Sequence, residues 1–291
     1  MNRPDPRLPD PRLNAFRPDL ADRRLEGKVR AARFVEGRPA RVVIANAGLR
    51  QAPRPDSEWG SELILGDDVM VFEEEEDWCW VQGARDFYVG YLTDTALAAP
   101  LGEPTHVVSV PRTFAYPGPE LRSPAIRALS IGSRVTVTGS AERRGTAYSL
   151  LDSGEAVVAR HLRPVGDHAA DYVAVAEQLL NTPYLWGGAS AFGLDCSGLL
   201  QLSMRMAGRL VPRDTDMQEK AIGAVLEVDP LGSGLERGDL VFWKGHVGIM
   251  VDGRTMIHAN GLSMTVALEP LREAITRIEP VYGRPTSIRR P

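Results

Sequence analysis

The sequence predicts an α+β protein in which two small all-β barrels precede a domain of helices and strands. Three observations support this class. Short runs that alternate apolar and polar residues begin at Arg41, a weak repeat joins two groups of these runs, and helical spacing followed by a series of strands begins after Pro164. Helices followed by strands, without regular alternation between them, are typical of an α+β domain. The length of 291 residues is enough for two or three domains.

Residues 1–38 form a segment of distinct composition that precedes the first strand. It is rich in Pro, Arg and Asp, and the tetrapeptide PDPR occurs at residues 4–7 and again at 9–12. Proline removes a backbone donor and disfavours helix at the preceding residue. The segment is therefore interpreted as an extended arm that wraps a domain, with plain disorder as the alternative.

The alternating runs predict a first barrel over residues 39–100 and a second over residues 101–166. SEWGSELILGDDVMV (57–71) aligns with SPAIRALSIGSRVTV (123–137) at an offset of 66, and YL at 91–92 matches HL at 161–162 at an offset of 70. Two copies of a small barrel explain this repeat better than one large sheet. Cys79 alternates inward in DWCWV, which predicts a core position.

Residues 167–291 are predicted to form the α+β domain. DYVAVAEQLLN (171–181) has helical apolar spacing and is stopped by Asn181 and Pro183, and CSGLLQLSMRMA (196–207) forms a second helix. Asp195 is the natural N-cap of the second helix, and Gly208 its C-terminal stop. Strands are expected at 238–243, 246–251 and 255–259.

Cys196 is the candidate nucleophile of this domain. At the start of a helix, the free backbone N–H groups and the helix dipole favour an anion, so we expect the pKa of the thiol to be lowered. His246 is the candidate base, and His258 would orient it and stabilise its cationic form. A three-residue loop, 252–254, places His258 opposite Gly248 and on the same face as His246, whereas a two-residue loop would separate the rings.

Each of these residues also has a structural interpretation. A lone Cys at a helix start is often a small buried residue, and a strand His is often a satisfied structural residue, but the three together favour chemistry. Asp195 either caps the helix alone or also faces a cation such as a substrate amino group, with Ser197 adding a hydrogen bond. His106, His161 and His168 have no partner in the pattern. No CxxC or HExxH motif accompanies the candidate residues, so neither a metal nor another cofactor is expected.

Composition narrows the function classes. The formal net charge of −4 offers no electrostatic footprint for nucleic acid or an anionic membrane. Two cysteines form no disulfide framework, and their scarcity is typical of a reducing compartment. The first residues contain no apolar segment typical of a secretory signal. The expected location is the cytoplasm, and the oligomeric state stays open.

Three segments resemble the NlpC family of cell-wall cysteine peptidases, which have a papain-like fold: TPYLWGGASAFGLDCSGLLQ (182–201), PRDTDMQ (212–218) and GDLVFWKGHVGIMVDGRTMIHA (238–259). The DWxWVQ and DxYVGYL patterns of the first barrel are similar to bacterial SH3-like domains. The second copy lacks DxYVGYL and is expected to be a spacer. The resemblance implies Cys196 as nucleophile, His246 as base and His258 as the third polar residue.

The whole layout is similar to the γ-D-glutamyl-L-diamino-acid endopeptidases, which cut peptidoglycan (murein) stem peptides after L-Ala-γ-D-Glu. Members of that branch require a free N-terminal L-Ala. By resemblance, its amine is held by Asp195, by Tyr88 and by an acid of the first barrel. Glu58 is the choice for this acid, and Glu62 is the alternative. Tyr184 and Ser197 complete the pocket. Ordinary packing is the alternative for the two tyrosines.

A requirement for a free alanine amine implies action on released stem peptides, which fits cytoplasmic recycling, with the first barrel gating the cleft. Two other hypotheses are an exported wall hydrolase and a catalytically idle module that binds murein peptides. The complete Cys–His–His set argues against the idle module. Whether the diamino acid is diaminopimelate or lysine, and how long a C-terminal extension fits, stays open.

Overall fold

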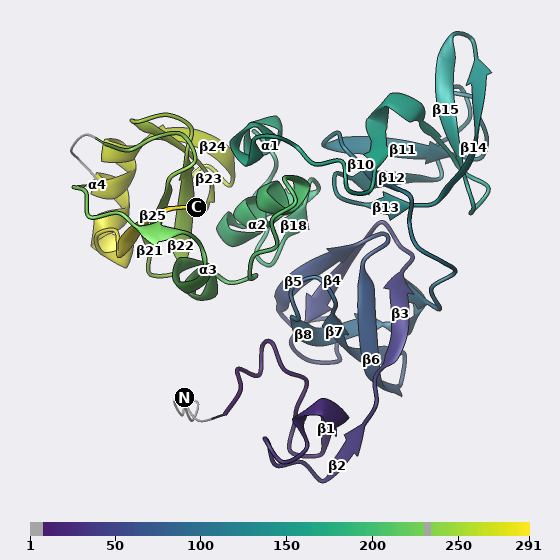
Figure 1. Ribbon diagram of the computed structural model, residues 1–291, viewed down its shortest axis with the longest axis horizontal. Coiled ribbons are helices and arrows are strands. Elements are labelled where there is room, and N and C mark those ends of the chain that lie inside the picture. The colour runs from purple at the N-terminus through teal and green to yellow at the C-terminus, as the bar shows by residue number, and fades with distance from the viewer. Residues whose placement is uncertain (1–7, 230–233) are drawn as a thin grey trace.

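The computed structural model describes residues 8–229 and 234–291. Figure 1 shows the second barrel and the α+β domain side by side above the first barrel, with the N-terminal arm below that barrel. The fold class expected from the sequence is confirmed, because two all-β units precede a domain of helices and a mostly antiparallel sheet.

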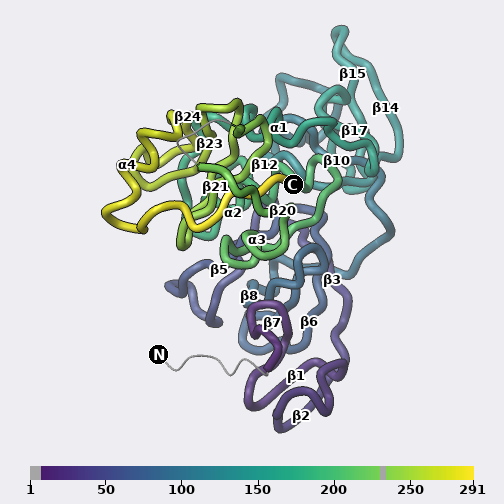
Figure 2. The backbone as a smooth tube through the Cα atoms, turned by 60° about the vertical axis from the view of Figure 1, so that its left-hand side comes forward, coloured from purple at the N-terminus to yellow at the C-terminus, as the bar shows by residue number. Residues whose placement is uncertain are grey.

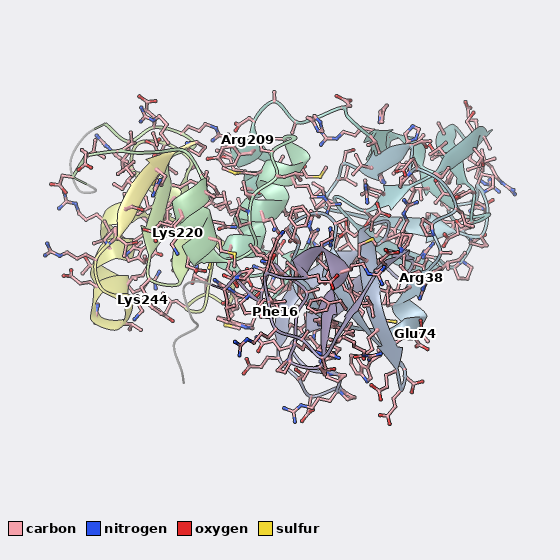
Figure 3. The ribbon with its side chains drawn as sticks, turned by 60° about the horizontal axis from the view of Figure 1, so that its bottom comes forward. Phe16, Arg38, Glu74, Arg209, Lys220 and Lys244 are labelled. Carbon is pink, nitrogen blue, oxygen red and sulfur yellow. The ribbon has the colours of Figure 1, made fainter. Side chains whose placement is uncertain are left out.

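The described part of the N-terminal arm packs against the first barrel. It contains β1 (Leu20–Asp22), the 3-10 turn η1 (Arg23–Leu25) and β2 (Arg33–Val35), and β1 pairs with β2 in parallel. Ala15 and Leu20 are buried against Phe72 and Trp80 of the barrel. Figure 3 shows the arm, with Phe16 labelled, running across this barrel. The arm is therefore an ordered strap from residue 8 onward, and residues 1–7 lie outside the described part.

The first barrel is a seven-stranded sheet with the strand order β5-β4-β8-β7-β6-β3-β9. Its elements are β3 (Arg38–Val42), β4 (Asn46–Arg50), β5 (Trp59–Ile64), β6 (Asp68–Glu75), β7 (Trp78–Gly83), β8 (Val89–Thr93), η2 (Asp94–Ala96) and β9 (Leu97–Ala98). Alternate residues of each strand point inward, as Ala47 and Leu49 do on β4. Cys79 is buried in the same core, as predicted.

The second barrel consists of two small sheets, in the orders β13-β10-β17 and β12-β11-β16-β15-β14. Its elements are β10 (His106–Val108), β11 (Arg112–Tyr116), β12 (Arg127–Ser130), β13 (Arg134–Val135), β14 (Val137–Arg143), β15 (Thr146–Leu151), β16 (Ala156–Val158), η3 (Ala159–His161) and β17 (Leu162–Pro164). Val108, Leu129 and Val157 lie in its core.

The sequence repeat at offset 66 corresponds to a repeated backbone geometry. Gly66 N–H donates to the carbonyl of Val42, and Gly132 N–H donates to the carbonyl of Val108, both at 2.9 Å. Both glycines have φ of +86°, a left-handed conformation that favours glycine. The turn that follows β5 in the first barrel therefore has the same geometry as the turn that follows β12 in the second barrel.

The match of YL at 91–92 with HL at 161–162 is wrong. The N–H of Val43 donates to Ala96, and the equivalent N–H of Ser109 donates to His161, both at 2.9 Å. His161 thus corresponds to Ala96, at an offset of 65 rather than 70. The cause is the loop between β15 and β16, which is shorter than the equivalent loop between β7 and β8. The sequence shows no clear gap at this place.

The α+β domain is built on a six-stranded sheet with the order β20-β25-β21-β22-β23-β24. Its elements are α1 (Tyr172–Gln178), β18 (Ala189–Ser190), β19 (Gly193–Leu194), α2 (Cys196–Met206), α3 (Thr215–Ala221), β20 (Ala224–Val225), β21 (Leu240–Trp243), β22 (His246–Met250), β23 (Thr255–Asn260), β24 (Thr265–Pro270), α4 (Leu271–Tyr282) and β25 (Ser287–Arg290).

Alternating residues of this sheet cover its two faces. Phe242 and Ile249 pack with α1 and α2, whereas Val241, Met250 and Met256 pack with α4. Figures 1 and 2 both show α3 on the side of the domain that faces the first barrel. This arrangement brings the start of α2 and the first barrel to a common cleft.

The predicted helices and hairpin are present with small changes at their ends. The N-caps of α1 and α2 are Asp171 and Asp195, whose side chains accept backbone N–H groups of the first turn. In the hairpin, Ile249 pairs with Ile257, and the N–H of Val251 donates to Thr255 at 2.9 Å. The predicted three-residue loop, 252–254, is therefore confirmed.

Candidate active site

Cys196 is the first residue of α2 and lies at the bottom of a pocket. Asp195 caps the helix by accepting the N–H of Gly198 at 2.7 Å. The sulfur lies 3.9 Å from the hydroxyl of Thr215 and 3.9 Å from the carbonyl oxygen of Gly245. It also accepts a hydrogen bond from the N–H of Val247. The sulfur is thus held against the backbone on both sides of His246.

His246 and His258 meet across the hairpin, as the register requires. Nε2 of His246 lies 2.9 Å from Nδ1 of His258, and the ring planes meet at 67°. His246 begins β22, and His258 is completely buried in the middle of β23. Two neighbouring strands therefore hold the imidazoles in direct hydrogen-bond contact.

The thiol and the nearer imidazole do not share a hydrogen bond in this conformation. Among residues 8–229 and 234–291, the sulfur's hydrogen-bond partners are those named above, and none is a nitrogen of His246. Catalytic hydrogen bonds are often long or poorly aligned without substrate. Proton transfer between them would require the sulfur and a ring nitrogen of His246 to come into hydrogen-bond contact.

The pKa of the thiol moves in the opposite direction from the sequence expectation. Burial, followed by the negative charge of Asp195, raises the pKa of Cys196 to about 11. Burial, followed by the neighbouring His258, lowers the pKa of His246 to about 3. The expected lowering at the helix N-terminus is wrong because desolvation of the charged thiolate outweighs the favourable helix dipole. The resting pair is a neutral thiol and a neutral imidazole.

A carboxylate stands behind the histidine pair. Oε2 of Glu269, on β24, lies 2.9 Å from Nε2 of His258. Arg277 of α4 donates to both oxygens of Glu269, at 2.9 and 2.6 Å. The sequence reasoning missed both residues because it followed the strands only to residue 259. The signal that could have found Glu269 is its place on the next strand, two positions beyond the partner of His258.

Asp195 both caps α2 and faces a cation that the chain itself supplies. The buried guanidinium of Arg213 donates to its two oxygens at 3.0 and 2.6 Å, and to the hydroxyl of Ser197 at 2.7 Å. Ser197 in turn donates to Asp195 at 3.1 Å. Arg213 lies in the PRDTDMQ segment, but its role could not be read from sequence because its partners are 16 and 18 residues away.

The pocket above Cys196 lies between three parts of the chain. Its volume is about 320 Å³, and its walls come from the arm, the first barrel and the α+β domain. The residues that line it include Arg12, Trp59, Tyr88, Tyr184, Trp186, Asp195, Cys196, Ser197, Arg213, Asp214, Thr215 and Asp216. Four predicted binding residues, Asp195, Ser197, Tyr184 and Tyr88, are therefore in one pocket with the sulfur.

The two glutamates considered for the amine site are not in this pocket. Glu58 is exposed to solvent. Glu62 is buried outside the pocket, where its carboxylate accepts the N–H of Ala189 at 2.8 Å and the side-chain amide of Asn46 at 2.9 Å. The acid next to Tyr88 is instead Asp214, whose Oδ2 accepts the tyrosine hydroxyl at 3.1 Å. It comes from the α+β domain, 126 residues away in the chain.

Arg12 of the arm ties the acids of the pocket together. Its guanidinium donates to Asp214 at 2.7 Å and to Asp216 at 2.9 and 3.0 Å. Burial raises the pKa of Asp214, while Arg213 and Arg12 lower it. The second PDPR tetrapeptide therefore contributes its arginine to the pocket, a role that the sequence did not indicate.

Two features are absent from the residues that the structure describes. No group of three or more His, Cys, Asp or Glu side chains there is arranged to hold a metal ion. No helix of that part of the chain has the length and apolar character needed to cross a membrane.

A cysteine at a helix start and two hydrogen-bonded histidines on neighbouring strands of an α+β fold are the residue types and fold typical of a cysteine peptidase domain. Residues 181–280 match the model of the NlpC/P60 family, and residues 49–97 match the bacterial dipeptidyl-peptidase Sh3 domain. The chain therefore carries an NlpC/P60 domain preceded by a bacterial SH3 domain. NlpC/P60 peptidases are cysteine peptidases.

Similar proteins cover most of the chain. A dipeptidyl-peptidase 6 from Lysinibacillus sphaericus is 28% identical over 239 residues, which are 75% of this chain and 86% of the relative. A γ-D-glutamyl-L-lysine dipeptidyl-peptidase from Bacillus subtilis is also 28% identical, over 74% of this chain and 77% of the relative. The crystal structure of an NlpC/P60 family protein from Bacillus cereus shares the fold, with a TM-score of 0.71 and 22% identity over 87% of this chain and 99% of that one.

Proposed function

We propose that this protein is a cysteine endopeptidase that cleaves the γ-D-glutamyl to L-diamino-acid bond of peptidoglycan stem peptides carrying a free N-terminal L-Ala. The observation that carries the proposal is the single pocket that joins Cys196 to Tyr88 and Asp214. The names of the Bacillus relatives support the bond and the substrate class.

The charges of the pocket favour a cationic amine. Three carboxylates line it, on Asp195, Asp214 and Asp216, against two guanidinium groups, on Arg12 and Arg213. Among the residues that line the pocket, the carboxylates therefore outnumber the guanidinium groups by one. A substrate ammonium group would supply the missing positive charge in a place where solvent screening is weak. We propose Asp214, in place of Glu58 or Glu62, as the acid that holds the amine with Asp195 and Tyr88.

Glycine lets the walls of this end of the pocket approach each other. Within the first barrel, a side chain at Gly60 would meet the ring of Tyr88 at 3.0 Å. Between the two domains, a side chain at Gly187 would meet the side chain of Trp59 of the first barrel at 2.7 Å. The first barrel can therefore lie close against the α+β domain. This close approach supports a role of the first barrel in limiting the length of peptide that the pocket can hold beyond the cleaved bond.

The proposed reaction begins with the turn of the Cys196 side chain toward His246. His246 takes the thiol proton while the sulfur attacks the γ-glutamyl carbonyl carbon, and the N–H at the start of α2 holds the developing oxyanion. The imidazolium then donates its proton to the leaving amine of the diamino acid. Water, activated by His246, releases L-Ala-γ-D-Glu and restores the thiol.

The proposed place of action follows from the amine. In intact peptidoglycan the alanine nitrogen is joined to muramic acid through an amide and carries no positive charge. A pocket that selects the free amine would act on released stem peptides, which supports a role in murein peptide recycling in the cytoplasm. Diaminopimelate and lysine both fit this proposal.

Three substrates test the proposed function. Purified protein is incubated with L-Ala-γ-D-Glu-diaminopimelate, with the N-acetylated peptide and with intact sacculi, and the products are separated by liquid chromatography. Cleavage of the free-amine peptide alone supports the proposal. Activity on sacculi alone would support an exported wall hydrolase, and binding without turnover would support an idle module.

Two variants accompany this assay. Cys196→Ala is expected to abolish turnover. Asp214→Asn is expected to reduce discrimination between the free and the acetylated peptide by at least about 30-fold, because removing one partner of a buried, hydrogen-bonded charge pair costs about 2 kcal/mol or more and 1.4 kcal/mol corresponds to a factor of ten. Equal discrimination by Asp214→Asn and wild type would remove Asp214 from the amine site.

A further inference from the structure

Glu269 and Arg277 are two partly buried residues that extend the hydrogen-bonded histidine pair. The side chain of His258 is inaccessible to solvent, and that of Glu269 is 17% exposed. Met256 pairs with Glu269 and His258 pairs with Ala267, so Glu269 is the diagonal neighbour of His258 on the same sheet face. That face is the one covered by α4, which carries Arg277. Neither residue lines the pocket, so neither has a place in substrate binding.

Two groups compete for Nε2 of His258. The Glu269 carboxylate lies at 2.9 Å and accepts hydrogen bonds, whereas the side-chain nitrogen of Asn260 lies at 3.2 Å and donates them. The orientation of Asn260 is set elsewhere, because its oxygen accepts the N–H groups of Leu262 and Ser263. A hydrogen bond to an ionised carboxylate is shorter and stronger than one between neutral groups. Nε2 of His258 therefore carries a proton and donates it to Glu269.

The proton on Nε2 of His258 determines which nitrogens carry protons in the rings of both His258 and His246. With Nε2 protonated, Nδ1 of neutral His258 is an acceptor, and it receives the Nε2–H of His246 across 2.9 Å. Nδ1 of His246 then has no proton. It also has no hydrogen-bond partner within residues 8–229 and 234–291, so it is free to accept the proton of the thiol.

We propose that Glu269, clamped by Arg277, is a positioning residue that selects the tautomers of His258 and His246 and so presents Nδ1 of His246 as the base. The proposal rests on the proposed function for its kinetic consequence, but the tautomer assignment stands on the geometry alone. Once His246 has taken the thiol proton, the same carboxylate stabilises the positive charge of the pair through His258.

Arg277 keeps the carboxylate in its ionised form. The guanidinium of Arg277 and the ring of His258 together lower the pKa of Glu269 to about 2, although burial opposes them. The charged and titratable groups that face Glu269 are these two, with His246 behind His258. Glu269 is therefore an acceptor throughout the neutral range, and it does not take the proton from His258.

The isosteric substitution Glu269→Gln tests this role. A glutamine amide must turn its nitrogen either to His258 or to Arg277, both of which are donors here, so one of the two contacts is lost. We expect kcat on the free-amine peptide to fall by about 10²–10⁴-fold, with KM changed by less than about threefold, as for loss of the carboxylate in a related triad. Glu269→Asp, which keeps an acceptor, is expected to recover at least a tenth of wild-type kcat.

The second readout does not depend on turnover. Nitrogen NMR of histidine-labelled protein distinguishes a protonated ring nitrogen from an unprotonated one. The chain has five histidines, and we expect Glu269→Gln to change the ring signals of His246 and His258 while those of His106, His161 and His168 stay constant. Glu273→Gln is the matched control, because it removes an exposed acid of α4. It should change neither the spectrum nor kcat.

The outcomes separate this inference from the proposed function. If wild type cleaves no stem peptide, the proposed function fails, and the ring signals of Glu269→Gln alone decide the positioning role. A folded Glu269→Gln variant with wild-type ring signals overturns the inference, whether or not kcat falls. If Glu269→Gln does not fold, Arg277→Gln is measured in the same two ways, and unchanged signals together with unchanged kcat overturn it.

Discussion

At the scale of single residues, the unusual feature is a nucleophile that the fold keeps neutral. Burial raises the pKa of Cys196, and it lowers the pKa of His246, so neither group is charged near neutral pH. An enzyme of this kind forms its thiolate only when the base receives the proton during the reaction. The raised pKa of the thiol predicts slow reaction with alkylating and oxidising agents at neutral pH.

The pH dependence of alkylation tests this protonation state. The rate of Cys196 alkylation by iodoacetamide is expected to rise about tenfold for each pH unit between pH 7 and 9, because the thiolate fraction rises tenfold per unit below the pKa. The raised pKa of about 11 predicts no plateau in this range. Mass spectrometry of the modified peptide gives the rate, and Cys196→Ala measures any reaction of the buried Cys79. A rate independent of pH from 6 to 9 would show a preformed thiolate–imidazolium pair instead.

At the scale of elements, the N-terminal arm contributes to the pocket above Cys196. The N–H of Val89 donates to the carbonyl of Arg12 at 2.8 Å, and the side-chain amide of Gln82 donates to the carbonyl of Leu13 at 2.8 Å. Farther along, the guanidinium of Arg17 lies 4.4 Å from the ring centroid of Trp80. The first barrel thus holds the arm in the position that brings Arg12 to Asp214.

Removal of the Arg12 charge should make activity depend on pH. Burial raises the pKa of Asp214 and Arg12 lowers it, so Arg12→Gln raises this pKa further. If the ionised carboxylate of Asp214 binds the amine as proposed, activity is expected to fall as the pH falls. We expect kcat/KM to be about tenfold below wild type at pH 6, with a smaller difference at pH 8, since one pKa unit corresponds to about 1.4 kcal/mol.

The control for this variant is Arg38→Gln. Arg38 forms an exposed ion pair with Glu74 at 2.9 Å, and Figure 3 shows both residues on the side of the first barrel away from the α+β domain. Its kcat/KM profile should follow that of wild type. A constant difference between Arg12→Gln and wild type across pH would contradict an effect through Asp214.

At the scale of the whole molecule, the buried carboxylate of Asp67 is part of the junction between the domains. Asp67 of the first barrel accepts Arg85 of the same barrel at 3.0 Å and Arg205 of α2 at 2.6 Å. Arg205 also donates to the carbonyl of Gly132 in the second barrel at 3.2 Å. The carboxylate is 2% exposed, and both arginines are at most 12% exposed. The helix that carries Cys196 is therefore anchored to both barrels at its far end.

Loss of this carboxylate should destabilise the assembly of domains. Asp67→Ala leaves two buried guanidinium groups without their counter-charge, which is expected to cost about 3–5 kcal/mol at pH 7. The arginines lower the pKa of Asp67, so its contribution is present above the ordinary Asp range and is lost as the pH falls below it. Calorimetry is expected to show a lower unfolding temperature for the variant, with a difference from wild type that shrinks toward pH 3.

An exposed ion pair provides the comparison for this measurement. Asp56 lies 3.5 Å from Arg54, and both side chains are at least 66% exposed. Asp56→Ala is expected to change the free energy of unfolding by less than about 0.5 kcal/mol. Equal effects of Asp56→Ala and Asp67→Ala would contradict the role of Asp67 as the junction between domains.

The sequence by itself determined the features that depend on local patterns. Apolar spacing located the core of α1 and α2, and Asp195 marked the start of the nucleophile helix. The turn at 252–254 was enough to place His246 and His258 on one face, because strand alternation has a period of two residues. The barrel repeat was also visible over its first half, where the two copies keep the same turn.

Only the tertiary structure decided the environment of these residues. Arg12, Tyr88 and Asp214 come from three parts of the chain, and Glu269 reaches His258 from a neighbouring strand. Contacts between distant segments leave no periodic signal in the sequence. The pKa of Cys196 is a further example, because the helix start predicts one direction while burial, which only the assembled domains produce, reverses it.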